Sequence, residues 1–488
     1  MEKESKVQII LRRILFTFIF IFILITTSSF WSMDTFGIMT FNQVLFTLQL
    51  SVQGTDIHIY ILYFLKALLP AILVFVLFHY IKRILKKKEN KIFYYIYLTI
   101  VFIFSFWISF IYIDKAWGIS QFASGLTEKS TFIEENYVDP RDVNITFPKK
   151  KRNLLHIYIE SMETSYGDKE NGGVFDKSRI PELTNLGKEN ITFSRNENDQ
   201  GAYTTYGTTW TIAGMLGQTS GIPLNVGGGE YKPKKFLPGI YNLGDILEEN
   251  GYENHIILGS EKKFAGRDKF FTQHGSYNIY DLNWALENDM LANGANDFWG
   301  IDDEELFELS KERLNEISKK DTPFNFTILT VDSHSPKGYL SENSSDEYED
   351  QYSNVLRGES KMVTDFVKWC MDQDWYENTT ILLTGDHFTM SSNYIDDELR
   401  DKRGVYNAII NMPDDLIRED RLKNRNFTTM DFFPTTIYIL GGEIKGDRLG
   451  LGTNLFSDEK TLSEIYSNEV LDREFMKKSE FYTYKFIK

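Results

Sequence analysis

Three long apolar stretches near the N-terminus constrain the fold of this chain more than any other feature of its sequence. They cover residues 9–31, 59–81 and 92–113. Each is close to the roughly 20 residues that a helix needs to cross a bilayer. Because the hydrocarbon core offers no partner for backbone N–H and C=O groups, such stretches must satisfy these groups within a helix. Residues 1–116 are therefore predicted to form a membrane region with three spans.

Basic residues flank these stretches unevenly. Six of them lie at residues 82–91, and Lys3, Lys6, Arg12 and Arg13 lie before or at the start of the first stretch. Cytoplasmic loops carry the excess of Lys and Arg in membrane proteins. We therefore expect both basic segments on the cytoplasmic side, the segment 34–54 at or in the outer surface, and everything after residue 114 outside. The first stretch lacks a small-residue cleavage site and is predicted to be an uncleaved anchor.

The charge and cysteine content narrow the possible partners and the source of stability. The formal net charge of −16 argues against nucleic acid as a partner, because that affinity comes mainly from basic residues that neutralise phosphates. A single cysteine, Cys370, excludes an intramolecular disulfide. Its place in an amphipathic helical pattern indicates a buried apolar residue. The extracytoplasmic part must therefore be stabilised by its own core.

The chain after the membrane region divides into three segments of different composition. Residues 117–152 are polar, contain two prolines and are predicted to be a linker. Residues 153–457 alternate strand and helix patterns, which is typical of an α/β domain. The expected strands are 154–159, 255–258, 324–331, 380–384 and 406–411, and the expected helices are 243–249, 303–318, 356–372 and 431–440. Residues 458–488 are predicted to be a polar tail.

Acidic and imidazole side chains directly follow three of the expected strands. Glu160 follows the first of them, Asp332 and His334 follow the third, and Asp386 with His387 follows the fourth. In open α/β sheets, ligands bind beyond the carboxyl ends of the strands. Oxygen and imidazole ligands together suit Zn²⁺ or Mn²⁺ better than Mg²⁺ or Ca²⁺. We therefore expect one metal-assisted site for phosphoryl transfer.

A hydroxyl-rich segment supplies a nucleophile for such a site. Residues 206–215, Tyr-Gly-Thr-Thr-Trp-Thr-Ile-Ala-Gly-Met, place hydroxyl groups on a Gly-containing turn where an apolar helical pattern begins. Helix N-termini carry free N–H groups that hold phosphate. A metal held by Glu160, Asp386 and His387 would lower the pKa of a threonine hydroxyl in this segment and make it a nucleophile at neutral pH.

Two further residues could contact the phosphoryl group. His334 could protonate a leaving oxygen or bind a phosphoryl oxygen. Arg267 has a planar guanidinium that suits a phosphodiester if its side chain points inward. The chain has no P-loop or Gly-rich nucleotide signature, which argues against ATP as the phosphoryl donor.

Taken together, the motifs resemble those of a known family. The chain is similar to membrane-anchored, sulfatase-like phosphoglycerol transferases, which include lipoteichoic acid synthases and the enzymes that decorate osmoregulated periplasmic glucans. The resemblance covers nearly the whole chain after residue 153. The motifs that carry it are at 159–163, 207–214, 242–247, 299–300, 330–334, 385–387, 430–435 and 449–456.

The resemblance implies an alkaline-phosphatase-like fold and one divalent ion, usually Mn²⁺, with Mg²⁺ or Zn²⁺ as alternatives. Carried over by position, the implied metal ligands are Glu160, Thr211, Asp386 and His387.

The same resemblance implies the residues that act on the substrate. Thr211 is the implied nucleophile and Thr209 is its rival, because the two family branches align differently at equal length. His334 and Arg267 match residues that hold the glycerol-phosphate group, and Trp299 is assigned to substrate binding with them.

The family function would be transfer of glycerol phosphate from phosphatidylglycerol through a phosphothreonine ester, with release of diacylglycerol. The acceptor would be a cell-surface glycan or teichoic-type polymer. Three spans instead of five, and Ala265-Gly266 before Arg267, favour the glucan-type branch over the synthases that polymerise glycerol phosphate.

Other functions remain open from the sequence. The same site could act as a phosphoethanolamine transferase or as a phosphodiesterase. A sulfatase activity is disfavoured because no Cys-x-Pro-x-Arg or Ser-x-Pro-x-Arg motif is present. The chain could also be a catalytically silent membrane-bound protein that binds glycans. The complete set of Glu160, Thr211, Asp386 and His387 argues against that alternative.

Overall fold

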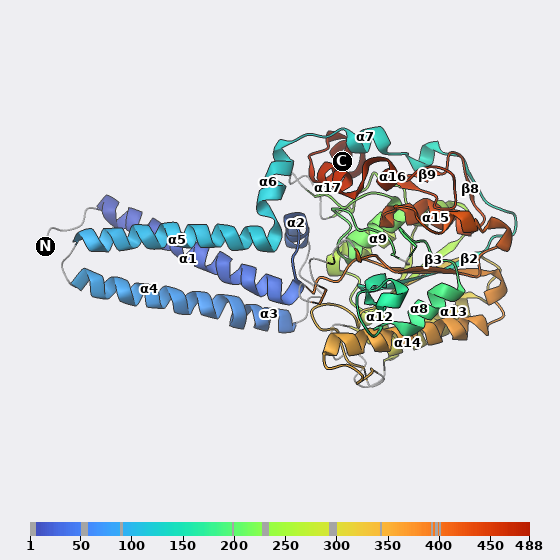
Figure 1. The fold of residues 1–488 in the computed structure, drawn as a ribbon, viewed down its shortest axis with the longest axis horizontal. Helices are drawn as coiled ribbons and strands as arrows, with labels where there is room; N and C mark the ends of the chain where they lie inside the picture. The colour runs from blue at the N-terminus through green and yellow to red at the C-terminus, as the bar shows by residue number, and fades with distance from the viewer. Residues whose placement is uncertain are drawn as a thin grey trace. The chain divides into compact units, whose positions relative to one another are not determined.

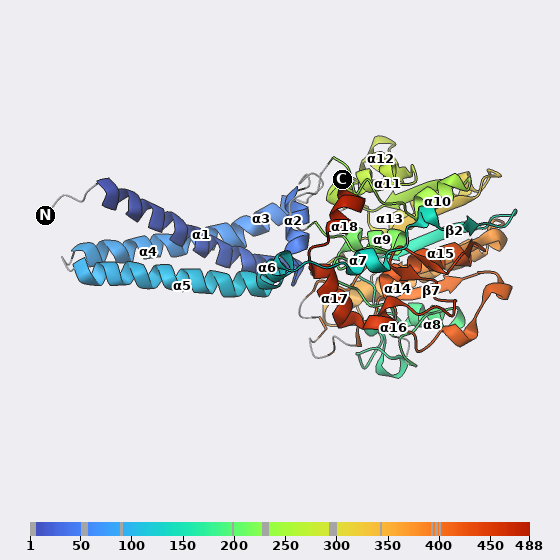
Figure 2. The ribbon, with the colours of Figure 1, turned by 90° about the horizontal axis from the view of Figure 1, so that it is seen from above.

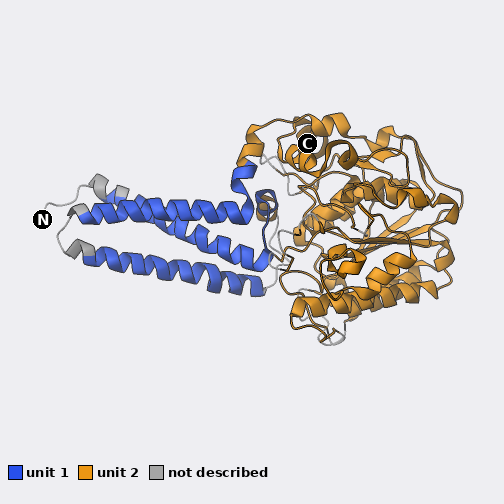
Figure 3. Cartoon of the chain, in the orientation of Figure 1, with its two compact units in different colours: residues 1–44, 55–122 blue, residues 45–54, 123–488 orange. Residues whose placement is uncertain are grey.

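The computed structural model describes residues 6–49, 57–87, 91–197, 200–226, 234–291, 300–341, 344–391, 394–395, 399 and 402–488. The chain forms two compact units, residues 1–44 with 55–122 and residues 45–54 with 123–488 (Figure 3). The first unit is helical, and the second is an α/β unit that contains the predicted site.

The first unit contains the three predicted apolar helices. The long helices are α1 (Lys6–Phe36), α4 (Leu69–Lys87) and α5 (Lys91–Trp117), and α3 (Ile57–Tyr63) continues into α4 through a π-helical segment (Phe64–Leu68). Within them, Arg12–Phe36, His58–Ile84 and Phe93–Trp117 are long and apolar enough to cross a membrane. The segment expected at the outer surface contains α2 (Phe41–Gln49).

The packing of these helices leaves much apolar surface uncovered. A small buried cluster consists of Ile19, Phe78, Tyr94 and Leu98. Many large apolar side chains of the same helices are exposed, including Phe104 at 64%. Contiguous exposed apolar surface of this kind is expected of a surface that contacts lipid or protein. The three helices and their exposure support a membrane-embedded unit.

The second unit is built on a six-stranded sheet with the order β4-β3-β5-β2-β6-β7. All neighbouring strands are parallel except β6 and β7. The strands are β2 (Asn153–Ile159), β3 (Glu253–Leu258), β4 (Asn278–Tyr280), β5 (Phe324–Leu329), β6 (Thr379–Gly385) and β7 (Asn407–Ile410). The five predicted strands are all present, with ends that shift by up to two residues.

Helices cover both faces of this sheet (Figures 1 and 2). Successive side chains of a strand point to opposite faces, so Leu155 and Ile157 of β2 join one core cluster while Leu154 joins another. The first cluster includes side chains of α8 (Pro181–Glu189), α13 (Asp303–Ile317) and α14 (Gln351–Met371). The other face is covered by α9 (Thr211–Ser220), α10 (Leu243–Glu249) and α15 (Phe432–Ile439). Cys370 is buried in the first cluster, as predicted.

The segments predicted to be a linker and a tail form parts of the folded units. The segment 117–152 contains α6 (Ile119–Thr127), α7 (Phe132–Asn136) and β1 (Ile145–Thr146), and β1 pairs with β8 (Glu443–Ile444). The segment 458–488 contains α16 (Leu462–Tyr466), α17 (Asn468–Met476) and α18 (Glu480–Tyr482). Residues of this last segment, including Leu471, Phe475 and Phe486, are buried in a core cluster of the second unit. Both segments are therefore more than a spacer and a solvated end.

Candidate active site

The sheet brings the predicted acidic residues together at the carboxyl ends of two neighbouring strands. The last residues of β2 and β6, Ile159 and Gly385, are register partners in the parallel ladder. Glu160 and Asp386 therefore leave the sheet side by side, although they are far apart in sequence. Both strands are buried along their whole length, which holds their ends in place.

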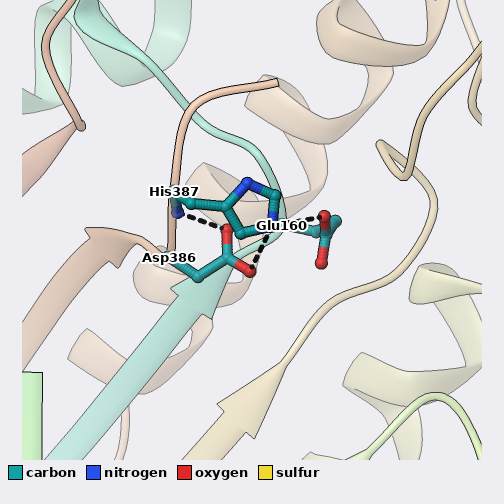
Figure 4. A group of neighbouring side chains, drawn as sticks. All are labelled: Glu160, Asp386 and His387. Atoms are coloured by element: carbon teal, nitrogen blue, oxygen red, sulfur yellow. Dashed lines mark hydrogen bonds and ion pairs between the residues drawn. The ribbon is translucent and has the colours of Figure 1, made fainter. Parts of the chain in front are cut away.

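Glu160, Asp386 and His387 form a compact buried cluster (Figure 4). One ligand atom from each lies within 4.8 Å of the others. The Nε2 atom of His387 is 3.5 Å from Glu160 Oε1 and 3.3 Å from Asp386 Oδ2. Two carboxylates and an imidazole in this arrangement fit a transition-metal ion or a similar divalent cation.

Hydrogen bonds fix the orientation of these side chains. Asp386 Oδ1 accepts from the backbone N–H groups of Ser161 and His387, both at 2.8 Å. The Nδ1–H of His387 donates to the carbonyl of Phe388 at 2.7 Å, which leaves Nε2 as the lone-pair atom that faces the carboxylates. Asp386 Oδ2 is buried and has no hydrogen-bond partner. An unpartnered carboxylate oxygen here is the observation expected where a cation belongs.

The electrostatics of the cluster also favour a cation. Burial, and next to it the charge of Asp386, raises the pKa of Glu160 well above its ordinary value. Two buried carboxylates this close repel each other when both are ionised. A divalent cation would offset this repulsion and favour the charged form of Glu160.

The hydroxyl of Thr211 points into this cluster. Thr211 is the first residue of α9, and its Oγ1 lies 3.3 Å from Glu160 Oε2 and 3.4 Å from His387 Nε2. The helix approaches the strand end closely because Gly214 has no side chain, since a Cβ there would lie 2.2 Å from the carbonyl oxygen of Asp386. In the described part of the chain, no hydrogen bond links the rival Thr209 to the cluster.

The structure also places His334 and Arg267 near the cluster. Both are buried, and the guanidinium of Arg267 donates to Ser260 Oγ at 2.7 Å and to the carbonyl of Glu261 at 3.0 Å. Burial lowers the pKa of Arg267 to about 10, and the charge of Glu160 opposes that shift. Burial, and with it the charges of His387 and Arg267, lowers the pKa of His334 to about 3, although a hydrogen bond to the backbone of Ser335 opposes the shift.

One residue expected at the site is not part of this arrangement. Asp332 does not join Glu160, because its carboxylate belongs to a second buried group with Asp303 and Glu359. The expectation that all three acidic segments form one site is therefore wrong for Asp332. Trp299, assigned to substrate binding, lies outside the described residues.

Several supporting residues were not singled out from the sequence. Ser161 adopts a left-handed backbone with φ of 53°, and its hydroxyl donates to Glu160 Oε1 at 2.8 Å. The buried carboxylate of Glu163 accepts from Arg403 Nε and from the backbone N–H of Thr389, which fixes the loop after His387. Ser161 and Glu163 lie within the motif at 159–163. Their short spacing from Glu160 therefore indicates that they belong to the same site. No sequence signal pointed to Arg403.

Comparison with known proteins identifies the class of this chain. Residues 152–442, more than half of the 488 residues, match the sulfatase family. The chain therefore belongs to the sulfatase family.

More specific relatives are phosphoglycerol transferases. The chain is 29% identical over 337 residues to phosphoglycerol transferase I of Escherichia fergusonii, and 30% identical over 335 residues to that of Escherichia coli O6:K15:H31. Each match covers 66% of this chain and 41% of the relative. The chain thus spans about two fifths of the length of these curated relatives.

Solved structures show the same fold at lower identity. The lipoteichoic acid synthase LtaP from Listeria monocytogenes matches with a TM-score of 0.51 and 17% identity, covering 67% of this chain and 81% of that chain. The integral membrane phosphoethanolamine transferase EptA from Neisseria meningitidis matches with a TM-score of 0.52 and 14% identity, covering 87% and 84%. These similarities confirm the predicted alkaline-phosphatase/sulfatase-like fold.

Proposed function

We propose that this protein transfers glycerol phosphate from phosphatidylglycerol to a hydroxyl of a cell-surface glycan or teichoic-type polymer. The observation that carries the proposal is the position of the Thr211 hydroxyl, within 3.4 Å of both Glu160 and His387 at the start of α9. A hydroxyl beside a group of cation ligands, at a helix N-terminus, has both the activation and the phosphate cradle that phosphoryl transfer needs.

In the first step, Thr211 Oγ1 forms a bond to phosphorus and the bond from phosphorus to the diacylglycerol oxygen breaks. A divalent cation held by Glu160, Asp386 and His387 would supply positive charge that favours the ionised threonine and offsets charge on the phosphoryl group. The departing diacylglycerol oxygen takes up a proton, and the released threonine proton balances it. In the second step, an acceptor hydroxyl attacks the phosphothreonine ester, and Thr211 leaves with a proton.

The first turn of α9 and two buried side chains position the phosphoryl oxygens. The first helical hydrogen bond of α9 runs from Gly214 N to Trp210 O, so the N–H groups before it remain available for an anion. We assign the phosphodiester group of the lipid to a position in contact with Arg267 and His334. A bound anion would raise the pKa of His334 from its value of about 3, which enables it to deliver the proton to the leaving oxygen.

The anchor fits a donor that is itself a membrane lipid. The three apolar helices would keep the second unit at the surface of the bilayer, which raises the effective concentration of lipid without additional contacts. The basic residues at 82–91 favour an orientation with the second unit on the extracytoplasmic side. The names of the relatives support glycerol phosphate as the transferred group.

We propose Mn²⁺ as the bound ion, with Zn²⁺ and Mg²⁺ as alternatives. Two carboxylates, one imidazole and a threonine hydroxyl are compatible with all three ions. The imidazole favours Mn²⁺ or Zn²⁺ over Mg²⁺.

The test measures release of diacylglycerol from labelled phosphatidylglycerol by the purified full-length protein with Mn²⁺. Thr211→Ala should abolish release, and Thr209→Ala is the matched control that should retain it. Mass spectrometry of the wild type, stopped during turnover, should find a glycerol-phosphate adduct on the peptide that contains Thr211. Retained release by Thr211→Ala would refute the assignment of the nucleophile.

The choice of lipid separates the rival functions. Consumption of phosphatidylethanolamine instead of phosphatidylglycerol would identify a phosphoethanolamine transferase, a name carried by the structural neighbour that covers 87% of this chain. Release of free glycerol phosphate in the presence of acceptor glycans would indicate a phosphodiesterase. No turnover of either lipid by a protein that binds Mn²⁺ would favour the silent glycan-binding alternative.

A further inference from the structure

A second group of buried carboxylates lies apart from the cluster of Glu160, Asp386 and His387. It consists of Asp303 at the start of α13, Asp332 in the turn after β5, and Glu359 in the middle of α14. One carboxylate oxygen from each lies within 4.8 Å of the others. The side chains are 0%, 1% and 0% exposed, so solvent does not stabilise their charges.

The backbone accounts for only part of this group. Asp303 accepts from the N–H groups of Val331 and Asp332, both at 2.8 Å, and Asp332 Oδ1 accepts from the N–H of Asp303 at 3.3 Å. By distance and angle, neither oxygen of Glu359 has a hydrogen-bond partner, although the side chains of Asp303 and Thr330 lie beside it, and Asp332 Oδ2 also has none. Asp332 and Glu359 therefore bring unpartnered oxygens to a group in which one ligand atom from each carboxylate lies within 4.8 Å of the others.

The charge of the group is also uncompensated. Among the described residues, no lysine, arginine or histidine forms an ion pair with Asp303, Asp332 or Glu359. The N-terminus of α13 contributes a positive end, but a helix terminus carries only about half an elementary charge. Buried carboxylates normally have a paired charge or a metal ion. A cation or a tightly held proton must therefore complete the group.

We propose that Asp303, Asp332 and Glu359 bind a second divalent cation of the hard, oxygen-preferring class represented by Ca²⁺ and Mg²⁺. The described ligands are all carboxylates, which is the donor type that these ions select. The first cluster differs because it includes the imidazole of His387, which suits softer ions. The two sites should therefore be separable by the ion that each retains.

The second site would act on the first through the turn between them. The Asp303 carboxylate holds the backbone N–H groups of 331–332, and Ser333 donates from its hydroxyl to the carbonyl of Glu160 at 2.6 Å. His334 follows directly in the chain, and its N–H donates to the carbonyl of Val331 at 3.0 Å. A cation bound here positions His334 and the backbone of Glu160 without contacting the substrate.

The experiment measures the Ca²⁺ content of purified full-length protein after removal of all metals and equilibration with Ca²⁺. Glu160→Gln disables the first site, so any ion that this variant retains belongs elsewhere. We expect Glu160→Gln to hold one Ca²⁺ per chain and the double variant with Glu359→Gln to hold none. Glu304→Gln, an exposed carboxylate on the first turn of the same helix, is the matched control and should retain the ion.

Thermal unfolding provides the second readout. Ca²⁺ should raise the melting temperature of Glu160→Gln and leave that of the double variant unchanged. If near-UV circular dichroism shows that the Glu359→Gln variant does not fold, Asp332→Asn is used in its place. Absence of Ca²⁺ and Mg²⁺ from folded Glu160→Gln overturns the proposal and identifies a shared proton, in which case Glu359→Gln should melt no lower than the wild type. None of these readouts depends on turnover of lipid.

Discussion

The close approach of α9 to the end of β6 can be tested by adding a single methyl group. A Cβ at residue 214 would lie 2.2 Å from the carbonyl oxygen of Asp386 and 2.9 Å from its carbonyl carbon. Both atoms belong to the backbone, so neither can rotate away. Ordinary contact begins at 3.4 Å, and Gly214→Ala therefore requires the helix and the strand end to separate by about 1 Å.

This separation has a predictable effect on activity. Thr211 lies one turn before Gly214 on the same helix, whereas Asp386 and His387 lie on the displaced strand end. A misplacement of about 1 Å can reduce a rate about 100-fold, which corresponds to about 2.7 kcal/mol in the barrier. The cost in folding free energy should be smaller, because about 1–3 kcal/mol of overpacking is offset by about 1 kcal/mol of improved helix propensity.

The assay is diacylglycerol release with Mn²⁺, measured well below the melting temperature of each variant. Gly217→Ala is the matched control on the same helix, because its Cβ would meet Thr208 Cγ2 at 3.0 Å and Met430 Cγ at 3.6 Å, which are side-chain atoms that can adjust. We expect Gly217→Ala to keep nearly full activity. A Gly214→Ala protein that is folded and as active as the wild type would show that the spacing between Thr211 and the cluster does not control the reaction.

Three further perturbations have defined outcomes. Burial lowers the pKa of His156 to about 3, so protonation of the unfolded chain below its ordinary pKa of 6.5 should destabilise the wild type by about 2 kcal/mol between pH 7 and pH 5. His156→Gln should lack this contribution in unfolding measurements at the two pH values, and equal pH slopes would contradict the reasoning. Arg267→Lys should lower kcat/KM about 10-fold or more, because lysine cannot keep the two hydrogen bonds to Ser260 and Glu261 while it faces the phosphodiester. Unchanged kinetics would show that Arg267 does not belong to the site. Removal of metal ions by a chelator should abolish activity and lower the melting temperature, because the repulsion between Glu160 and Asp386 returns. Added Mn²⁺ should restore both activity and melting temperature. Full activity of verified metal-free protein would exclude the proposed cation.

Local patterns in the sequence predicted the elements of the site well. Buried parallel strands are continuous apolar runs, so the ends of β2 and β6 were visible as the points where Glu160 and Asp386 interrupt them. The start of α9 was visible as a change from hydroxyl residues to an apolar helical pattern. These features depend on residues that are neighbours in the chain.

The same patterns failed where burial depends on distant segments. The segment 458–488 looks polar in composition, but Leu471 and Phe475 lie four residues apart on one face of α17 and are buried. Asp332 and Glu160 both follow strands, which predicts one shared site, yet the Asp332 carboxylate meets Glu359 from α14. Only the packing of α13 and α14 on the sheet determines which carboxylates Asp332 meets.

The sequence by itself determined that the chain has three apolar helices, an α/β unit, and acidic residues at strand ends, because hydropathy and periodicity are local properties. The tertiary structure decided which of those residues meet. Glu160 and Asp386 became neighbours because β2 pairs with β6, and Thr211 reached them because Gly214 lets α9 approach the strand end. Strand order and helix packing follow from the burial of the whole core, and no short segment of the sequence carries that information.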